Sequence, residues 1–221
     1  MADNSKKVAL VTGVGRLEGL GFEISRQLAA RGFRVLLTAR DGGKAQALAD
    51  RLKADGKDVH AYRLDVTSAK DIAAIAAAVD KDWHQLDVLV NNAAGASPYG
   101  EKPSGTDLAQ AKVVMEATLF GAWRLCQTFM PLLKRSLAAR IVNVSSGAGS
   151  HGDPLFGFAS GNGMGPGYAI SKAADHHLTR CLAAEWGPKN VRVNAIAPGL
   201  IVTDFAKALW EDEKRRKERE E

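Results

Sequence analysis

A tyrosine and a lysine four positions apart are the residues whose types and spacing best suit proton transfer. They stand in the run Tyr168-Ala-Ile-Ser-Lys172, and this spacing places both side chains on one face of a helix. A phenol has a pKa of about 10, and an ammonium group held close to it favours the phenolate. Such a pair can act as an acid and a base near neutral pH, although the same pattern is common on exposed helix surfaces.

A pair of serines precedes this run, at the end of an expected strand. Ser145 and Ser146 follow the run Ile141-Val-Asn-Val144, which is typical of a strand. Open parallel sheets bind their ligands at the carboxyl ends of their strands. We therefore expect Tyr168 and Lys172 to belong to a ligand site rather than to a plain surface.

A glycine-rich turn follows the first apolar run of the chain. It reads Thr12-Gly13-Val14-Gly15-Arg16-Leu17-Glu18-Gly19-Leu20-Gly21, and a helical pattern begins there. Glycines at a strand-to-helix turn permit positive φ and let backbone N–H groups approach a pyrophosphate at the helix N-terminus. The turn predicts a nucleotide-phosphate loop, and close packing of the helix on the sheet is the alternative.

The end of the second apolar run indicates which nucleotide is preferred. Ala39 occupies the strand end and Arg40 follows it, while Arg16 lies in the phosphate loop. A cation at this position favours a 2′-phosphate, whereas an acid binds the ribose hydroxyls and repels that phosphate. We therefore expect NADP(H). NAD(H) stays possible because Asp41 comes next, and Arg40 could instead pair with Asp41 or Asp65.

Apolar runs alternate with helical patterns along the whole chain. Strands are expected over 8–12, 33–39, 59–64, 86–90, 140–144 and 191–196, and helices over 19–31, 43–54, 69–81, 107–133 and 168–186. Short Val/Ile/Leu-rich strands separated by helices indicate a parallel sheet covered on both faces. The predicted fold is α/β, a single doubly wound domain over residues 1–221.

Composition limits the possible functions. The 221 residues are 46% hydrophobic and 25% charged, and the formal charge of +5 is spread along the chain rather than gathered in one stripe, which disfavours nucleic acid as a partner. No apolar run is long enough to span a membrane, and no secretory signal is visible. Two cysteines, Cys126 and Cys181, form neither a disulfide framework nor a metal site and are expected to be buried thiols. A cytoplasmic location fits best.

Together these motifs resemble the short-chain dehydrogenase/reductase family over residues 6–204. The matching pieces occur in the family's order: Thr12-Gly13 with Gly19-Leu20-Gly21, Asp65-Val66, Asn91-Asn92-Ala93-Ala94-Gly95, Val144-Ser145-Ser146, Tyr168 with Lys172, and Asn194-Ala-Ile-Ala-Pro198-Gly199 with Thr203. The resemblance implies a Rossmann-type fold, a nicotinamide cofactor and hydride transfer between a carbonyl compound and an alcohol.

The resemblance also implies a role for each matching residue. Tyr168 would protonate the carbonyl oxygen as the hydride arrives, and Ser146 would orient that oxygen. Lys172 would lower the pKa of the tyrosine and bind the nicotinamide ribose. The other cofactor-binding positions are Gly13, Gly15, Arg16, Gly19, Leu20, Gly21 and Arg40 at the phosphates, Asp65 and Val66 at the adenine, Asn91 and Ala93 along the cleft, and Pro198, Gly199, Ile201 and Thr203 at the nicotinamide.

The chain departs from the family pattern inside the site. Five residues separate Gly13 from Gly19, as if two had been inserted into the phosphate loop. Thr118 stands where the family commonly has an asparagine that helps to hold a water in the proton relay. A threonine hydroxyl can partly substitute for that amide, so Thr118 remains a catalytic candidate.

Two further departures concern the substrate side. Ser146 and Tyr168 are separated by a glycine-rich segment, 146–167, which we expect to be a wall of the substrate site. Its candidate lining residues are His151, Phe156, Phe158 and Met164. After Thr203 the chain continues only as a charged tail, 205–221, so the usual last strand is expected to be missing, and the tail either replaces the substrate lid or leaves it absent.

The sequence thus predicts an NADP(H)-dependent enzyme that interconverts a ketone or aldehyde and an alcohol. Reduction of an activated carbon–carbon double bond is a second possibility, against which the intact Ser146 and Tyr168 argue. A cofactor-binding scaffold or sensor with little catalysis is a third, suggested by Thr118 and the altered loop. No metal or membrane is expected as a partner, and a homodimer or higher oligomer is expected through the long helix and the Tyr168 helix.

Overall fold

One sheet of six parallel strands forms the centre of the computed structural model, which describes residues 6–152 and 164–211. The strands are β1 (Val8–Val11), β2 (Arg34–Ala39), β3 (Val59–Arg63), β4 (Val88–Asn91), β5 (Ala139–Val144) and β6 (Val191–Ile196). They lie in the order β3-β2-β1-β4-β5-β6, so the chain changes direction across the sheet between β1 and β4. Open α/β sheets bind ligands at such a reversal, beyond the carboxyl ends of the strands.

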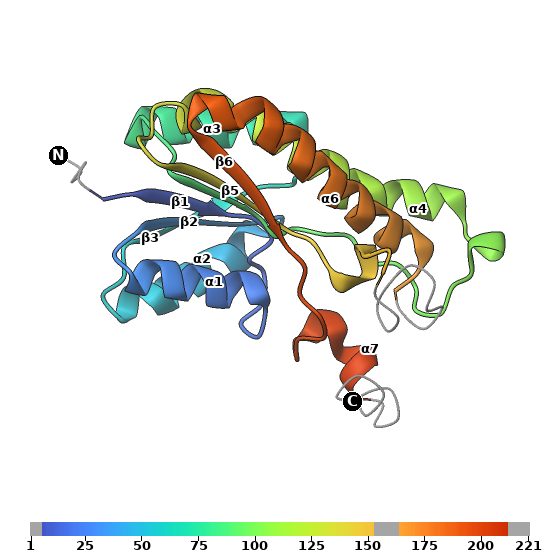
Figure 1. The fold of residues 1–221 in the computed structure, drawn as a ribbon. Coiled ribbons are helices and arrows are strands. Elements are labelled where there is room, and N and C mark those ends of the chain that lie inside the picture. Colours follow the sequence, from blue (N-terminus) through green and yellow to red (C-terminus); the bar gives the residue numbers. More distant parts are fainter. Residues whose placement is uncertain (1–5, 153–163, 212–221) are drawn as a thin grey trace.

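Helices cover both faces of this sheet (Figure 1). One face carries α1 (Leu20–Ala30) and α2 (Gly42–Ala54), and the other carries α3 (Ala69–Trp83), α4 (Leu108–Met115), α5 (Gly121–Leu133) and α6 (Pro166–Trp186). Successive strand residues point to opposite faces, so Leu10 and Leu36 enter the core beneath α3, α5 and α6, whereas Val11 and Leu37 enter the core beneath α1 and α2. Both faces are buried, and this confirms the doubly wound parallel sheet that the apolar strands predict.

The expected long helix over 107–133 is interrupted. It consists of α4, a π-helical turn (Glu116–Phe120) and α5. In the turn, the Gly121 N–H donates to the carbonyl of Glu116, five residues back. Gly121 lies against the loop after β3, where a Cβ would come within 2.9 Å of Val66. The start of α5 therefore packs closely against the loop after β3.

The chain after β6 forms a 3₁₀ turn (Asp204–Ala206) and the short helix α7 (Lys207–Trp210), which lie below the carboxyl ends of the strands in Figure 1. The described residues contain no seventh strand. Most of the charged tail lies outside them.

The two cysteines differ in their surroundings. Cys126 is buried in the core, as expected, but Cys181 is exposed on α6. The prediction for Cys181 was wrong because the apolar pattern around it belongs to a helix face that the rest of the described chain does not cover. Within the described ranges, no group of His, Cys, Asp or Glu has the arrangement of a metal site, and no helix is long and apolar enough to cross a bilayer.

Candidate active site

The three side chains predicted to handle the proton lie together at the carboxyl end of β5. Tyr168 and Lys172 occupy the first turns of α6 and are 7% and 3% exposed. Ser146 follows β5, and its hydroxyl interacts with the Tyr168 phenol. The Lys172 ammonium nitrogen lies 5.6 Å from the centre of the tyrosine ring. The structure therefore brings all three into one buried group.

Contacts between β5 and α6 hold this group in place. The Lys172 ammonium donates to the carbonyl of Val144 at 2.5 Å, and the Ser145 hydroxyl donates to the carbonyl of Lys172 at 3.1 Å. The 3₁₀ turn after β5 (Gly147–Gly149) also presses on α6, since a Cβ on Gly149 would lie 2.6 Å from the backbone nitrogen of Ala173. The first glycines of the 146–167 segment thus allow the helix to approach the strand end.

Burial controls the charges at the site. It raises the pKa of Tyr168 to about 12, because the opposing interaction with Ser146 is weaker than the loss of solvent. Burial also lowers the pKa of Lys172 to about 8. Desolvation thus sets the direction of the pKa shift of Tyr168 in this structure. A lowering of the tyrosine pKa by Lys172 stays a prediction. Tyr168 is held as a neutral phenol, which is the form that donates a proton.

Three residues that the sequence patterns did not single out lie around Tyr168. The loop after β4 contributes Ser97, whose hydroxyl accepts a hydrogen bond from the Tyr168 N–H at 3.0 Å. The segment after β6 contributes Phe205, whose ring centre lies 6.0 Å from that of Tyr168. Tyr99 joins these two segments by donating to the Phe205 carbonyl at 3.2 Å. A loop serine and a phenylalanine within a charged tail carry no sequence signal for these positions.

Thr118 lies in the π-helical turn and is 2% exposed. Its hydroxyl accepts a hydrogen bond from the Gly95 N–H at 3.0 Å. Single π-helical turns are frequent at functional sites, and this one fixes the loop that follows β4. A part for Thr118 in a proton relay stays a prediction.

The glycine loop lies at the sheet reversal and is tied to the loop after β4. The hydroxyl of Thr12 accepts hydrogen bonds from the N–H groups of Asn92 and Ala93, both at 3.0 Å. Gly13 has φ +73°, and a Cβ there would lie 2.7 Å from the Cα of Ala93. A Cβ on Gly21 would lie 2.6 Å from the Asn92 side-chain nitrogen. Gly13 is therefore sterically required, because backbone atoms leave no room for a Cβ. At Gly21 the Asn92 side chain would have to shift, and Gly15 has room for a methyl group.

The two additional loop residues are accommodated in a turn before α1. The Gly19 N–H donates to the Arg16 carbonyl at 3.3 Å to close this turn, and α1 still begins at Leu20. No side chain caps α1, whereas α2, α3 and α4 are capped by Asp41, Ser68 and Asp107. Uncapped N–H groups at a helix start bind anions well. The loop therefore fits a dinucleotide pyrophosphate.

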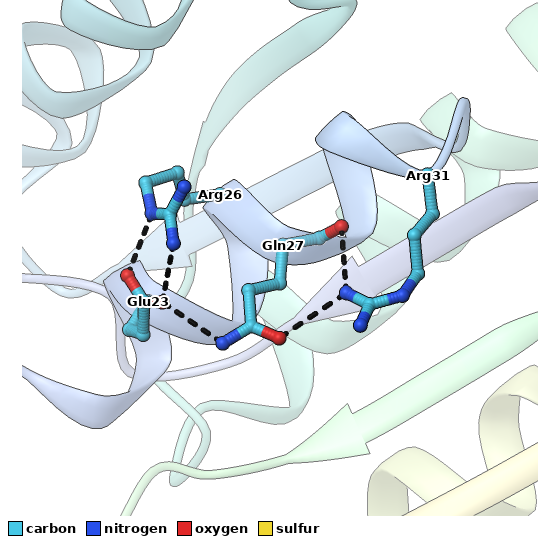
Figure 2. A network of polar contacts seen from close by, with 4 residues as sticks. All are labelled: Glu23, Arg26, Gln27 and Arg31. Carbon is cyan, nitrogen blue, oxygen red and sulfur yellow. Dashed lines mark hydrogen bonds and ion pairs between the residues drawn. The ribbon is translucent and has the colours of Figure 1, made fainter.

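An acidic residue in the first turn of α1 does not disturb this anion site. Glu23 accepts hydrogen bonds from Arg26 and Gln27, and Gln27 in turn binds Arg31 (Figure 2). The bonds from Arg26 and Gln27 lower the pKa of Glu23 to about 2. Its negative charge is therefore balanced along the exposed face of the helix.

The carboxyl ends of β2 and β3 are rich in arginine. Arg40 is exposed beyond β2, and Arg63 ends β3 directly opposite Ala39. Although partial burial opposes it, hydrogen bonds from Thr67 and the charges of Arg40 and Arg63 lower the pKa of Asp65. Arg63 was missed by sequence reasoning, because only the strand register places it beside Arg40.

Asp41, the residue that kept NAD(H) possible as the cofactor, caps a helix in the structure. One of its carboxylate oxygens accepts hydrogen bonds from the N–H groups of Gly43 and Lys44, at 2.9 and 3.1 Å, and caps α2. A carboxylate engaged in this way is less available to a ribose hydroxyl.

The remaining predicted residues occupy the same edge of the sheet or its supports. Asn91 is buried, and its amide donates to Asn143 of β5 at 2.8 Å, so it supports the cleft through the sheet. The Pro198 carbonyl accepts from the Gly147 N–H at 3.0 Å, which keeps the loop bearing Gly199, Ile201 and Thr203 beside the Ser146 turn.

The predicted substrate wall is described only in part. Met164 packs against the Tyr168 cluster, while His151 is exposed. Phe156 and Phe158 lie outside the described residues. Of the two candidates within the described residues, Met164 is the one that lies at the tyrosine.

Comparisons with known proteins identify the family of the chain. The model of the short chain dehydrogenase family matches residues 7–214. The chain is 32% identical to the 7alpha-hydroxysteroid dehydrogenase of Escherichia coli (strain K12), over 92% of this chain and 74% of that protein. It is also 32% identical to the (+)-neomenthol dehydrogenase of Arabidopsis thaliana, over 93% and 86%.

Solved structures are similar as well. The Pseudomonas aeruginosa RhlG/NADP active-site complex is 31% identical and superimposes with a TM-score of 0.82, over 95% of this chain and 78% of that one. A metagenomic short-chain oxidoreductase in complex with NADP is 31% identical, with a TM-score of 0.76, over 88% and 82%. Its ordered motifs, its doubly wound sheet and these relatives show that the chain belongs to the short-chain dehydrogenase/reductase family of oxidoreductases.

Proposed function

We propose that this protein is an NADP(H)-dependent oxidoreductase that interconverts a ketone or aldehyde and an alcohol, with Tyr168 as the general acid and base. The observation that carries the proposal is the buried group at the end of β5, where the neutral Tyr168 phenol meets the Ser146 hydroxyl and the Lys172 ammonium lies nearby. The named activities of the relatives, a hydroxysteroid and a neomenthol dehydrogenase, support an alcohol or ketone as the substrate.

In the proposed reaction, the bound nicotinamide supplies or accepts the hydride. During reduction, the Oη of Tyr168 gives its proton to the substrate oxygen, and during oxidation it takes that proton back. Ser146 holds the same oxygen by a second hydrogen bond. Lys172 keeps a positive charge near the phenol, where it stabilises the phenolate left after proton transfer. The Phe205 ring shields one side of Tyr168 from water.

The preference for NADP(H) rests on the arginines at the ends of β2 and β3. The charges of Arg40 and Arg63 both act on Asp65 at this strand end, and Arg63 is also paired with Asp71 at 2.6 Å. Cations at this position would favour a 2′-phosphate, and Asp41 is occupied as a helix cap. NADP in the titles of two similar structures is in line with this preference.

Substitution of Arg40 by alanine tests the cofactor preference. We expect Arg40→Ala to raise the Kd for NADPH about tenfold or more, because one charge-assisted contact to the phosphate is lost, and to leave the Kd for NADH nearly unchanged. Quenching of tryptophan fluorescence measures both constants. Arg31→Ala, at the other end of α1, removes the same charge and is the control. An equal loss for both cofactors would show that Arg40 does not distinguish them.

The activity itself is tested by the loss of NADPH absorbance with a panel of aliphatic, cyclic and aromatic ketones and aldehydes. Turnover of at least one carbonyl compound is expected, and the reverse reaction should follow with the matching alcohol and NADP. An enone reduced at its double bond would instead favour the carbon–carbon reductase. Tight NADPH binding without turnover of any compound would favour a scaffold or sensor.

We also propose that the protein acts in the cytoplasm as a homodimer or higher oligomer built on the outer face of α4, α5 and α6. Apolar side chains are exposed there, with Leu108 at 71%, Val113 at 62% and Trp123 at 39%. A groove of about 400 Å³ between α5 and α6 is lined in part by Trp123 and Leu178. Contiguous exposed apolar surface is typical of an interface. Sedimentation velocity measures the oligomeric state, and a monomer at micromolar concentration would contradict this assembly.

A further inference from the structure

A second buried charge lies on the catalytic helix, and the proposed mechanism does not use it. Asp175 follows Lys172 by three residues on α6 and is 2% exposed. Carboxylates are almost never fully buried unless they are paired, since the loss of water is costly. A spacing of i, i+3 makes Asp175 and Lys172 neighbours on the helix surface.

The surroundings of Asp175 leave its charge only partly compensated. Its Oδ1 is buried and has no hydrogen-bond partner. Burial raises the pKa of Asp175, and the charges of Lys172 and His176 and the hydroxyl of Ser145 act in the opposite direction. The backbone nearby is fixed, because the Thr179 hydroxyl donates to the Asp175 carbonyl at 2.8 Å. The carboxylate is therefore rigidly placed but not neutralised by hydrogen bonds to both of its oxygens.

The groups that face Asp175 come from three elements. Lys172, His176 and Tyr168 share α6 with it, Ser145 follows β5, and Cys126 lies on α5. The negative charge of Asp175 adds to burial in raising the pKa of Tyr168 and of Cys126. Lys172 is the exception, because there Asp175 opposes the effect of burial.

Lys172 needs such a partner. Its ammonium donates to the neutral carbonyl of Val144, and burial alone favours the uncharged amine. The charge that counteracts this tendency is that of Asp175. A buried ammonium without a counter-charge would lose its proton at a lower pH.

We propose that Asp175 is a positioning residue whose buried carboxylate keeps Lys172 charged in the active site, and that this pair sets the upper pH limit of catalysis. The proposal rests on the proposed function for its effect on activity, but the mutual influence of the two buried charges does not require the cofactor. Asp175 acts through Lys172 and does not touch the reacting atoms.

The effect on activity follows from the direction of the shifts. Activity that requires charged Lys172 is present below the pKa of the lysine and is lost as the pH rises through it. Asp175→Asn removes the counter-charge and lowers the Lys172 pKa. We expect the alkaline limb of kcat/KM with NADPH to move down by about one pH unit, which is a tenfold change in the lysine protonation equilibrium. Asp175→Glu keeps the negative charge and should return the alkaline limb to its wild-type position.

A matched control separates charge from structure. Thr179→Val changes no charge but removes two buried hydrogen bonds, the one to the Asp175 carbonyl and the one accepted from the Asn143 amide. We expect its alkaline limb to coincide with that of the wild type. A limb unmoved in Asp175→Asn, or moved equally in Thr179→Val, would overturn the proposal.

Unfolding of the cofactor-free protein provides a test that does not depend on activity. Urea titrations at pH 7 are compared for the wild type, Asp175→Asn, Lys172→Met and the double variant. Asp175→Asn should raise the unfolding equilibrium constant about tenfold in the wild type, but not in the Lys172→Met background, where it removes an unpaired charge. The same effect in both backgrounds would mean that Asp175 only packs. If the wild type turned over no substrate but showed this coupling, the proposed function would fail and the pair would stand.

Discussion

Tyr168→Phe is expected to lower turnover by about 10²–10⁴-fold while NADPH binding stays close to that of the wild type. The phenylalanine ring keeps the volume and the contact with Phe205, so the site should keep its shape. Only the Oη, and with it the proton donor, is lost. Single-turnover loss of NADPH absorbance with an accepted ketone measures the chemical step, and fluorescence quenching measures binding.

The control for this substitution is Tyr62→Phe, which removes a half-buried phenol from β3, a strand at the far edge of the sheet. It should leave turnover unchanged. Retained turnover in Tyr168→Phe would refute its role as the general acid. Loss of both turnover and NADPH binding would instead indicate a structural role for the hydroxyl.

Gly13→Ala should be the most damaging small substitution in the cofactor loop. The residue has φ +73°, and the added Cβ would lie 2.7 Å from the Cα of Ala93. A left-handed conformation costs an alanine about 1–2 kcal/mol, and overpacking against fixed backbone costs about 1–3 kcal/mol more. We expect a loss of about 2–5 kcal/mol in the free energy of unfolding, and a displaced loop that binds NADPH at least tenfold more weakly.

Gly32→Ala separates the two parts of this effect. Gly32 also has positive φ, at +85°, but no atom lies within 4 Å of its hypothetical Cβ. Its alanine variant should lose only about 1–2 kcal/mol and bind NADPH normally. Urea denaturation and fluorescence titration measure both variants. Equal losses at the two positions would mean that the contact between Gly13 and Ala93 contributes nothing.

The strands and the order of the site motifs could be predicted from the sequence because their causes are local. Runs such as Val8–Val11 are apolar throughout, and this pattern is typical of a strand that is buried on both faces of a sheet. The glycine loop and the Tyr168–Lys172 spacing are likewise short-range patterns, so they can be recognised without knowing the tertiary structure. The turn glycines are recognisable in that local pattern, whereas the close contacts of Gly13 and Gly21 are with Ala93 and Asn92, which are distant in sequence.

The features that could not be predicted depend on residues distant in sequence. Asp175 reads as an ordinary polar position of an amphipathic helix, and its burial follows from packing against the end of β5 and α5. Phe205 stands in a charged segment and meets Tyr168 only through the return of the chain after β6. The raised pKa of Tyr168 has the same origin, since the degree of burial is set by tertiary packing.

The π-helical turn at Glu116–Phe120 has a consequence for how α4 and α5 can change. One additional residue in a helix advances every later side chain by about 100° around the axis. With that residue present, α4 packs against α6 while Leu125 and Phe129 of α5 still enter the core. A deletion of one residue from the turn would therefore rotate the buried stripe of α5 toward solvent.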